Sequence, residues 1–235
     1  ICPIFNSDGN EPISKQNRTN QNGPLNGVGV RYNGQMLDLN RDAMKVETPE
    51  VYGMITNVLN KWDPAIMMDL HTTNGSYHTE PLTYTWMMNG NTDRNLVNYM
   101  RDKMMPWMKT TLTKKYNTPN VFYGEFRDMR DPSKGWDSYA FEPRYIVNYI
   151  GLRNRLSILN ENYVYADFKT RVLGCYSLLK AVLYYASANK DEIKKILKDA
   201  DDRTIARGMN PTEKDSFAVE FVNKPTPTPE VINAY

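Results

Sequence analysis

Two short runs, Ala65-Ile66-Met67-Met68-Asp69-Leu70-His71 and Leu156-Ser157-Ile158-Leu159-Asn160-Glu161, indicate the fold of this chain. Each run opens with a few consecutive apolar residues. Such a run is too short for a typical helix, and it is typical of a strand that is buried on both faces. Each then ends in polar residues, and strand ends are where open α/β sheets hold their ligands. We therefore predict that residues 65–70 and 156–159 are buried central strands, with His71 and Glu161 at their ends.

Helical patterns flank these strands. Residues 49–61 carry apolar residues at helical spacing, and residues 91–116 do so with an interruption expected at Pro106. Residues 168–202 predict one long helix or a broken pair, whereas residues 82–87 are rich in strand-forming side chains. Strands separated by long helices favour an α/β fold with a mixed sheet.

The remaining segments are rich in turn-forming residues. Residues 6–35 predict a long loop, and residues 117–143 predict an irregular connection. Residues 1–5 form an abrupt apolar start that suggests the second half of a buried strand, so N-terminal strands of the sheet are expected to be missing. Residues 216–235 are expected to be a Pro-rich exit segment toward a missing C-terminal region, which leaves residues 1–215 as one domain.

The composition excludes several classes of protein. With 40% hydrophobic and 24% charged residues, the 235-residue chain is not collagen-like, disordered or a coiled coil. A net charge of +2 is too small to indicate nucleic acid or a polybasic membrane patch, and no run approaches the ~18 apolar residues of a membrane span. Cys2 and Cys175 match no disulfide framework and no zinc-site spacing. The only histidines are His71 and His78.

Three polar groups are candidates for chemistry, each with a plainer alternative. His71 could be a metal ligand, a general base or a structural residue. Glu161 follows a buried run, where a carboxylate is costly unless it is paired or used, although it could also be a solvated strand end. Residues 38–42 form a dense polar cluster or a surface turn with a helix cap. For His78, a structural role is favoured over a substrate contact at the rim of a cleft.

Together these motifs resemble those of the carboxypeptidase A-like zinc metallocarboxypeptidases, over roughly residues 4–190. The resemblance is carried by Asn6-Ser7-Asp8-Gly9, where the family commonly has Asn-Pro-Asp-Gly, then Asp38-Leu39-Asn40-Arg41, Asp69-Leu70-His71 and Glu161. The order and spacing of these motifs support the resemblance more strongly than any single motif does. The resemblance implies a three-layer α/β/α sandwich around a mixed, mostly parallel sheet, with residues 1–215 as a partial catalytic domain.

The resemblance also implies a role for each residue. His71 would be the third protein ligand of a catalytic Zn²⁺ whose open position holds water. Glu161 would be the general base that takes a proton from that water. Asn40 and Arg41 would bind the terminal carboxylate of the substrate, because the planar fork of Arg can bind a carboxylate through two hydrogen bonds. Asp38 would hold a ligand histidine in the correct tautomer.

Two further roles have several candidates. An arginine that stabilises the oxyanion at the scissile carbonyl is assigned to Arg18, with Arg31 as the alternative. A mobile tyrosine over the substrate is assigned to Tyr145, with Tyr139 and Tyr149 also near enough in sequence.

One departure from the family pattern is large. Its first two zinc ligands come as His-x-x-Glu, but Asn74 and Pro81 stand three residues after His71 and His78. One protein ligand cannot hold a catalytic zinc, so we expect the chain to be inactive by itself. Either the missing ligands lie in a preceding segment of a parent protein, or the metal has been lost; the abrupt apolar start favours the first.

The expected activity is hydrolysis of a C-terminal peptide bond, or of a peptidoglycan-type amide beside a free carboxylate. It would depend on Zn²⁺ in the complete parent protein, and exopeptidases of this type are often secreted or periplasmic. The alternatives are a deacylase of N-acyl amino acids, a metal-free relative that binds carboxylates through Asn40 and Arg41, and a domain in which these residues are incidental. Glu161 argues against the metal-free relative, because carboxylate binding has no use for a base. The sequence does not predict the side-chain preference or the oligomeric state.

Overall fold

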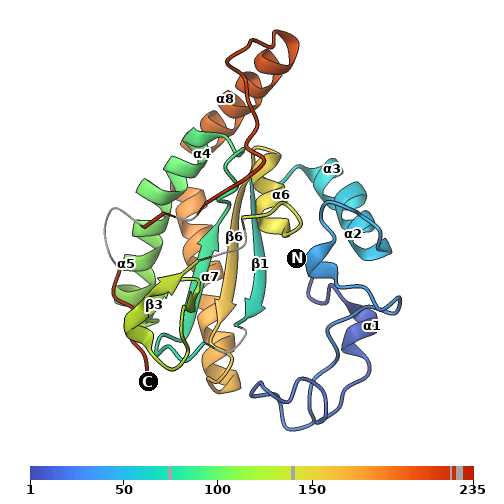
Figure 1. Ribbon diagram of the computed structural model, residues 1–235, viewed down its shortest axis with the longest axis vertical. Helices are drawn as coiled ribbons and strands as arrows, with labels where there is room; N and C mark the ends of the chain where they lie inside the picture. The colour runs from blue at the N-terminus through green and yellow to red at the C-terminus, as the bar shows by residue number, and fades with distance from the viewer. Residues whose placement is uncertain (74–75, 139–140, 223, 226–229) are drawn as a thin grey trace.

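The computed structural model describes residues 1–73, 76–138, 141–222, 224–225 and 230–235. A four-stranded sheet lies at its centre, in the order β1-β6-β2-β3 (Figure 1). The strands are β1 (Ile66–Thr72), β6 (Leu156–Asn162), β2 (Leu82–Trp86) and β3 (Asn120–Phe122). β1 runs parallel to β6 and β2 parallel to β3, whereas β2 and β6 are antiparallel. The fold is therefore α/β with a mixed, mostly parallel sheet, as the sequence predicts.

The two strands that indicated the fold differ in burial. β6 pairs with β1 on one side and with β2 on the other, and all 7 of its residues are buried. β1 lies at the edge of the described sheet and is mostly half-buried. The prediction of a central buried strand at residues 65–70 is thus wrong for the described chain. The apolar run specifies a strand, but it does not specify whether both edges of that strand are paired.

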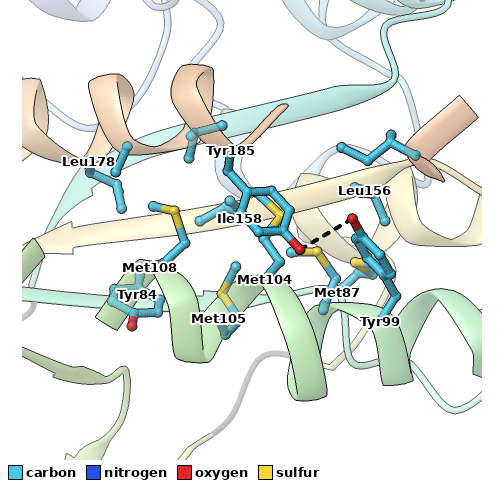
Figure 2. Packing of buried hydrophobic residues seen from close by; sticks show 14 of the residues in the cluster. Tyr84, Met87, Tyr99, Met104, Met105, Met108, Leu156, Ile158, Leu178 and Tyr185 are labelled. Carbon is cyan, nitrogen blue, oxygen red and sulfur yellow. Dashed lines mark hydrogen bonds between the residues drawn. The ribbon is translucent and has the colours of Figure 1, made fainter. Parts of the chain in front are cut away.

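One face of the sheet carries the main hydrophobic core. α5 (Met105–Tyr116) and α7 (Phe168–Ala188) contact the sheet, and α4 (Arg94–Tyr99) and α8 (Lys190–Met209) pack beside them (Figure 1). Figure 2 shows how methionine side chains fill the space between these helices and β6, a task that suits the flexible thioether. The cluster comprises Leu82, Tyr84, Met87, Leu96, Tyr99, Met100, Met104, Met105, Met108, Leu112, Leu156, Ile158, Leu178, Ala181, Val182, Tyr185, Ile193, Leu197 and Ala200.

The helix predicted over residues 91–116 forms in three consecutive pieces. Between α4 and α5 lies η3 (Met100–Met104), a π-helical turn. Pro106 follows in the first turn of α5, where the missing backbone N–H of proline costs least. The expected interruption is therefore present as a change of helix type just before the proline.

The opposite face of the sheet carries a second, smaller cluster. α2 (Pro49–Met54), η2 (Ile55–Leu59) and α3 (Asn60–Trp62) form one continuous helical segment, which confirms the prediction for residues 49–61. α6 (Ile146–Leu152) contacts both β1 and β6. The cluster comprises Leu39, Val51, Ile55, Leu59 and Ile150, with Met67 of β1 packed against it. α6 was not predicted from the sequence. It is only seven residues long and contains β-branched residues and a glycine, which give a weak helical signal.

Short elements lie in the segments predicted to be irregular and in the polar cluster at residues 38–42. These are α1 (Ser7–Asn10), η1 (Leu39–Arg41), η4 (Pro132–Lys134), and a two-stranded sheet of β4 (Glu125–Phe126) and β5 (Trp136–Asp137). β3 also lies in the segment predicted to be irregular. The prediction for residues 168–202 is resolved as a broken pair, because Asn189 separates α7 from α8.

The first residues of the chain differ from the expectation, and the last residues contact the loop that follows β1. Residues 1–5 form no strand, and Ile1, Ile4 and Phe5 are exposed, so the prediction of a buried strand there is wrong for the described chain. Near the other end, the backbone N–H of Tyr235 donates to the carbonyl of Tyr77, and residues 233–235 lie against residues 77–79. In the described ranges, no helix is both long and apolar enough to cross a membrane.

Candidate functional site

The candidate site lies at the carboxyl ends of β1 and β6, which are side by side in Figure 1. His71 and Glu161 are register partners in these two parallel strands. Register partners in neighbouring strands point to the same face and are about 4.8 Å apart in the backbone. Asp69 stands two residues before His71 and therefore shares that face. The fold thus brings an imidazole and two carboxyl groups together at the position where open α/β sheets bind ligands.

His71 is held in an acidic environment. Its Nε2 atom lies 2.8 Å from Oδ2 of Asp69, and its side chain is 28% exposed. Burial disfavours the charged imidazole, but the carboxylates of Asp69 and Glu161 outweigh it and raise the pKa of His71 above its ordinary value. A protonated imidazole would therefore form an ion pair with Asp69.

Glu161 is the more unusual group of the pair. Only 7% of the residue is exposed, and its Oε2 atom is buried without a hydrogen-bond partner among the described residues. Burial raises the pKa of Glu161, and although His71 opposes this shift, the pKa stays above that of an ordinary glutamate. A buried carboxyl group with a raised pKa can exchange a proton near neutral pH. Its backbone is fixed by the hydroxyl of Thr83, which donates to the Glu161 carbonyl at 3.0 Å.

Both candidate arginines lie within electrostatic reach of Glu161. Burial and the neighbouring Arg31 lower the pKa of Arg18, while Asp38 and Glu161 act in the opposite direction. Arg31 also acts on the titration of Glu161 and His71. Nε of Arg31 is paired with Oδ2 of Asp38 at 2.8 Å, whereas Arg18 has no ion-pair partner in the described part of the chain. The two arginines therefore put positive charge beside the buried carboxyl group.

Asp38 lies at the start of η1, where it contacts Arg31. Its carboxylate binds Arg31 and accepts a hydrogen bond from the backbone N–H of Asn40 at 3.0 Å. It therefore caps η1, as in the alternative of a turn with a helix cap, and its carboxylate forms no hydrogen bond or ion pair with a histidine within the described ranges. A capping Asp and a histidine-orienting Asp cannot be told apart in the sequence, because both precede a polar turn.

Arg41 and Tyr145 lie together. The guanidinium carbon of Arg41 is 4.7 Å from the centroid of the Tyr145 ring, and Nη1 of Arg41 donates to the carbonyl of Asn40 at 2.6 Å. Tyr145 packs against a small cluster that contains Leu159, two residues before Glu161 on the same face of β6. The exposed guanidinium of Arg41 is thus held on an aromatic ring near the strand ends.

The other two candidate tyrosines are placed differently. Tyr149 lies below the guanidinium of Arg153 and packs with the cluster of α2. Tyr139 lies outside the described residues. Of the described candidates, Tyr145 therefore has the contact with Arg41.

His78 is not part of this group. It is fully buried, with its ring centroid 4.7 Å from that of Tyr163 and 5.6 Å from that of Trp136. Burial lowers the pKa of His78 below its ordinary value. This position fits the structural role favoured from the sequence and does not fit a contact at the rim of a cleft.

The residues present do not complete a zinc site. In the part of the chain that the structure describes, no three His, Cys, Asp or Glu side chains are grouped so as to hold a metal ion. Asp69, His71 and Glu161 share a face without forming such a group, and their set contains one imidazole. Catalytic zinc sites use three protein ligands, commonly with two or three histidines, so the described residues do not form one by themselves.

Two members of the site were not predicted from the sequence. Asp69 was quoted in the motif, but its contact with His71 was not anticipated, although the alternation of side chains along a strand places both on one face. Thr83 carries no sequence signal, because it becomes the register partner of Glu161 through the antiparallel pairing of β2 and β6.

No match was found when the chain was compared with protein-family models, with curated proteins and with solved structures.

Proposed function

We propose that this chain carries part of a hydrolytic site that cleaves an amide bond beside a free carboxylate, as zinc carboxypeptidases do. The observation that carries the proposal is the placement of Glu161. It is a buried carboxyl group with an unpartnered oxygen, at a strand end beside His71 and within reach of two arginines. Such a group is costly to bury, and a role in proton transfer accounts for it.

Glu161 acts as the general base in this proposal. It takes a proton from the attacking water and later returns it to the leaving amine. Its raised pKa suits both steps, because the best catalytic pKa lies near the working pH. Arg18 or Arg31 stabilises the negative charge that develops on the scissile carbonyl oxygen, since both act electrostatically on Glu161.

Arg41 binds the free carboxylate of the substrate. Its guanidinium is exposed and is held against the ring of Tyr145, which limits its freedom before the substrate arrives. Arg can bind a carboxylate through two parallel hydrogen bonds, which selects substrates by geometry as well as by charge. Asn40, whose carbonyl accepts from Arg41, is the neighbouring polar contact.

The metal enters this proposal only as a partial site. His71 is one ligand, and the residues described here do not supply the others. The zinc-dependent part of the proposal therefore requires donors besides those of the described residues. The finer architecture, a three-layer α/β/α sandwich, is proposed on the same grounds, with one helical layer on each face of the sheet.

The test compares substrates that differ only at the carboxylate. N-acylated dipeptides with a free C-terminus and their C-terminal amides are given to the native protein, which here is a zinc-loaded parent that supplies the remaining metal donors, and to Arg41→Ala in the same parent. The native protein should prefer the free acid, and Arg41→Ala should lose about thirty- to a thousand-fold in kcat/KM on it.

Amidation of the substrate should cause a similar loss in the native protein and little further loss in Arg41→Ala. Lys45→Ala, which removes an exposed cation in a nearby ion pair with Glu47, is the control and should keep the preference. Equal cleavage of acid and amide by the native protein would contradict the proposal. Binding of the acid without any cleavage would instead favour a carboxylate-binding protein.

A further inference from the structure

The loops that follow β1 and β6 also line a cavity, together with part of the N-terminal segment. A cavity of about 430 Å³ is lined by Thr19, Asn20, Gln21, Asn22, Tyr77 and Tyr165. Tyr77 follows His71 in the loop after β1, and Tyr165 follows Glu161 in the loop after β6. The cavity therefore opens at the same end of the sheet as the candidate site, and its volume lies within the range of small-molecule sites.

Two stacked tyrosine rings form one wall of the cavity. The rings of Tyr77 and Tyr165 are nearly parallel, at 4°, with centroids 5.1 Å apart. Tyr163, a buried residue, packs its ring edgewise against Tyr165 with centroids 5.6 Å apart. The stack is thus anchored on the Tyr165 side, while Tyr77 is 51% exposed. This arrangement presents an aromatic ring that is held in place before any ligand binds.

The other wall comes from the N-terminal segment. Nδ2 of Asn22 donates to the carbonyl of Tyr165 at 2.6 Å, and the carbonyl of Asn22 accepts from Nη2 of Arg171 at 2.5 Å. The backbone N–H of Gln21 donates to the carbonyl of Arg18 at 3.0 Å, in a turn. These contacts fix the loop against the tyrosine stack and connect it to one of the arginines beside Glu161.

The lining has a distinct chemistry. Its six residues carry hydroxyl groups, amides and aromatic rings, and none of them is charged. Amide side chains both donate and accept hydrogen bonds, and the tyrosine rings supply apolar faces. The nearest cations, Arg171 on the carbonyl of Asn22 and Arg18 before Thr19, lie outside this set of lining residues. The lining instead matches a neutral ligand with many hydroxyl or acetamido groups and one apolar face, which is the chemistry of a sugar ring.

We propose that this cavity binds a neutral sugar residue, with the sugar ring against Tyr77 and its hydroxyl and acetamido groups on the amides of residues 20–22. The sugar is carried by the substrate of the neighbouring site, so the substrate class is a peptide joined to a saccharide. This second statement rests on the proposed function, whereas sugar binding itself does not.

The test is a titration of the protein with N-acetylglucosamine oligomers, followed by NMR and calorimetry. Binding should perturb the signals of Tyr77, Tyr165 and residues 20–22. Tyr77→Ala should weaken the affinity by about tenfold, because it removes the packing surface for the sugar. Tyr52→Ala is the matched control, because Tyr52 is a 60% exposed tyrosine on α2, and it should bind as the native protein does.

Gln21→Ala provides a second variant that leaves the tyrosine stack intact. It should weaken sugar binding without changing the circular dichroism spectrum. Absence of sugar binding by the native protein, or equal affinities for Tyr77→Ala and the native protein, would overturn the inference. Because the titration needs no turnover, it can succeed even if hydrolysis is never observed, and the two proposals fail separately.

Discussion

At the scale of single residues, the main core contains two buried tyrosines whose hydroxyl groups contact each other. Tyr99 and Tyr185 are buried, and their hydroxyl groups are joined by a 3.2 Å hydrogen bond (Figure 2). Burial, together with this hydrogen bond, raises the pKa of Tyr99 above that of an exposed tyrosine. Each hydroxyl is thus acceptable in the core because the other one satisfies it.

Tyr185→Phe should therefore destabilise the protein by about 1 to 2 kcal/mol, because it leaves the Tyr99 hydroxyl buried without this partner. Tyr184→Phe is the matched control, since Tyr184 is the preceding residue, 53% exposed, and should change little. Urea denaturation of both variants measures the difference. Equal stability of the two variants would show that the hydroxyl pair contributes nothing.

Residues of the candidate site also show what sequence can predict. His71 and Glu161 were identified because each ends an apolar run, and the strand pairing brings them together. Asp38 caps η1, and its implied role beside a ligand histidine stays a prediction, because one carboxylate can cap a turn or orient a histidine with the same neighbours in sequence. The contact of Arg41 with Tyr145 joins residues about a hundred positions apart, and only the fold establishes it.

At the scale of elements, α4 and α8 are joined through one carboxylate. Asp93 caps α4 by accepting from the backbone N–H groups of Asn95 and Leu96, and it binds Nε and Nη2 of Arg203 on α8 at 2.9 Å each. Burial opposes the charge of Asp93, but the hydrogen bonds and charge of Arg203 outweigh it and lower the pKa of Asp93. The cap and the link between the helices therefore depend on the same ionised group.

Asp93→Asn isolates the ionic part of this contact, because Asn caps helices about as well as Asp. We expect a loss of about 1 to 2 kcal/mol at neutral pH, since Arg203 keeps a weaker partner. The pKa of Asp93 is lower in the folded than in the unfolded protein, where it is near 3.9. The ionised carboxylate therefore stabilises the fold fully above about pH 3.9, and this stabilisation is lost as the pH falls through the folded-state pKa. The difference between variant and native protein should therefore shrink as the pH falls below about 3.9.

Chemical denaturation at neutral and acidic pH measures this difference. Asp102→Asn serves as the control, because Asp102 pairs with Arg101 at the exposed surface and such pairs contribute little. A difference that stays constant between the two pH values would contradict the assigned role of the charge.

Elements also differ in how well the sequence specified them. The segment 91–116 was predicted as a helix, with an interruption at its proline, because long periodic patterns are the strongest local signal. β3 to β5 were missed, since strands of two or three residues carry no periodicity, and α6 was missed because its β-branched residues and glycine give a weak helical signal. Residues 1–5 were misassigned because an apolar run indicates burial only where a partner is present.

At the scale of the whole molecule, the arrangement of layers explains the polar site. The main core fills one face of the sheet, whereas the second and smaller cluster fills only part of the other. Asp69, His71 and Glu161 lie on this second face, beyond the apolar residues of β1 and β6. The alternation of strands and helices in the sequence predicts the α/β class. It does not predict whether β1 pairs on one side or on both, because that depends on contacts between distant parts of the chain.

The partial ligand set leads to a prediction for metal binding. The purified chain should bind Zn²⁺ weakly or not at all, because one imidazole with its neighbouring carboxylates is too few for a catalytic site. Calorimetry with zinc and metal analysis after dialysis measure this directly, with His71→Ala as the comparison. Stoichiometric zinc at micromolar or tighter affinity would show that the ligand set has been misidentified.

The central claim is that Glu161 moves a proton in amide hydrolysis, and Glu161→Gln tests it most directly. The native protein and the variant, each in a zinc-loaded parent that supplies the remaining metal donors, are compared for release of the C-terminal residue from an N-acylated dipeptide. Exposed Glu213→Gln is the matched control. We predict that Glu161→Gln loses about a hundred- to ten-thousand-fold in kcat with an unchanged fold and substrate affinity, because Gln keeps the size of Glu but accepts no proton. Turnover by Glu161→Gln equal to that of the native protein and of Glu213→Gln would contradict the account.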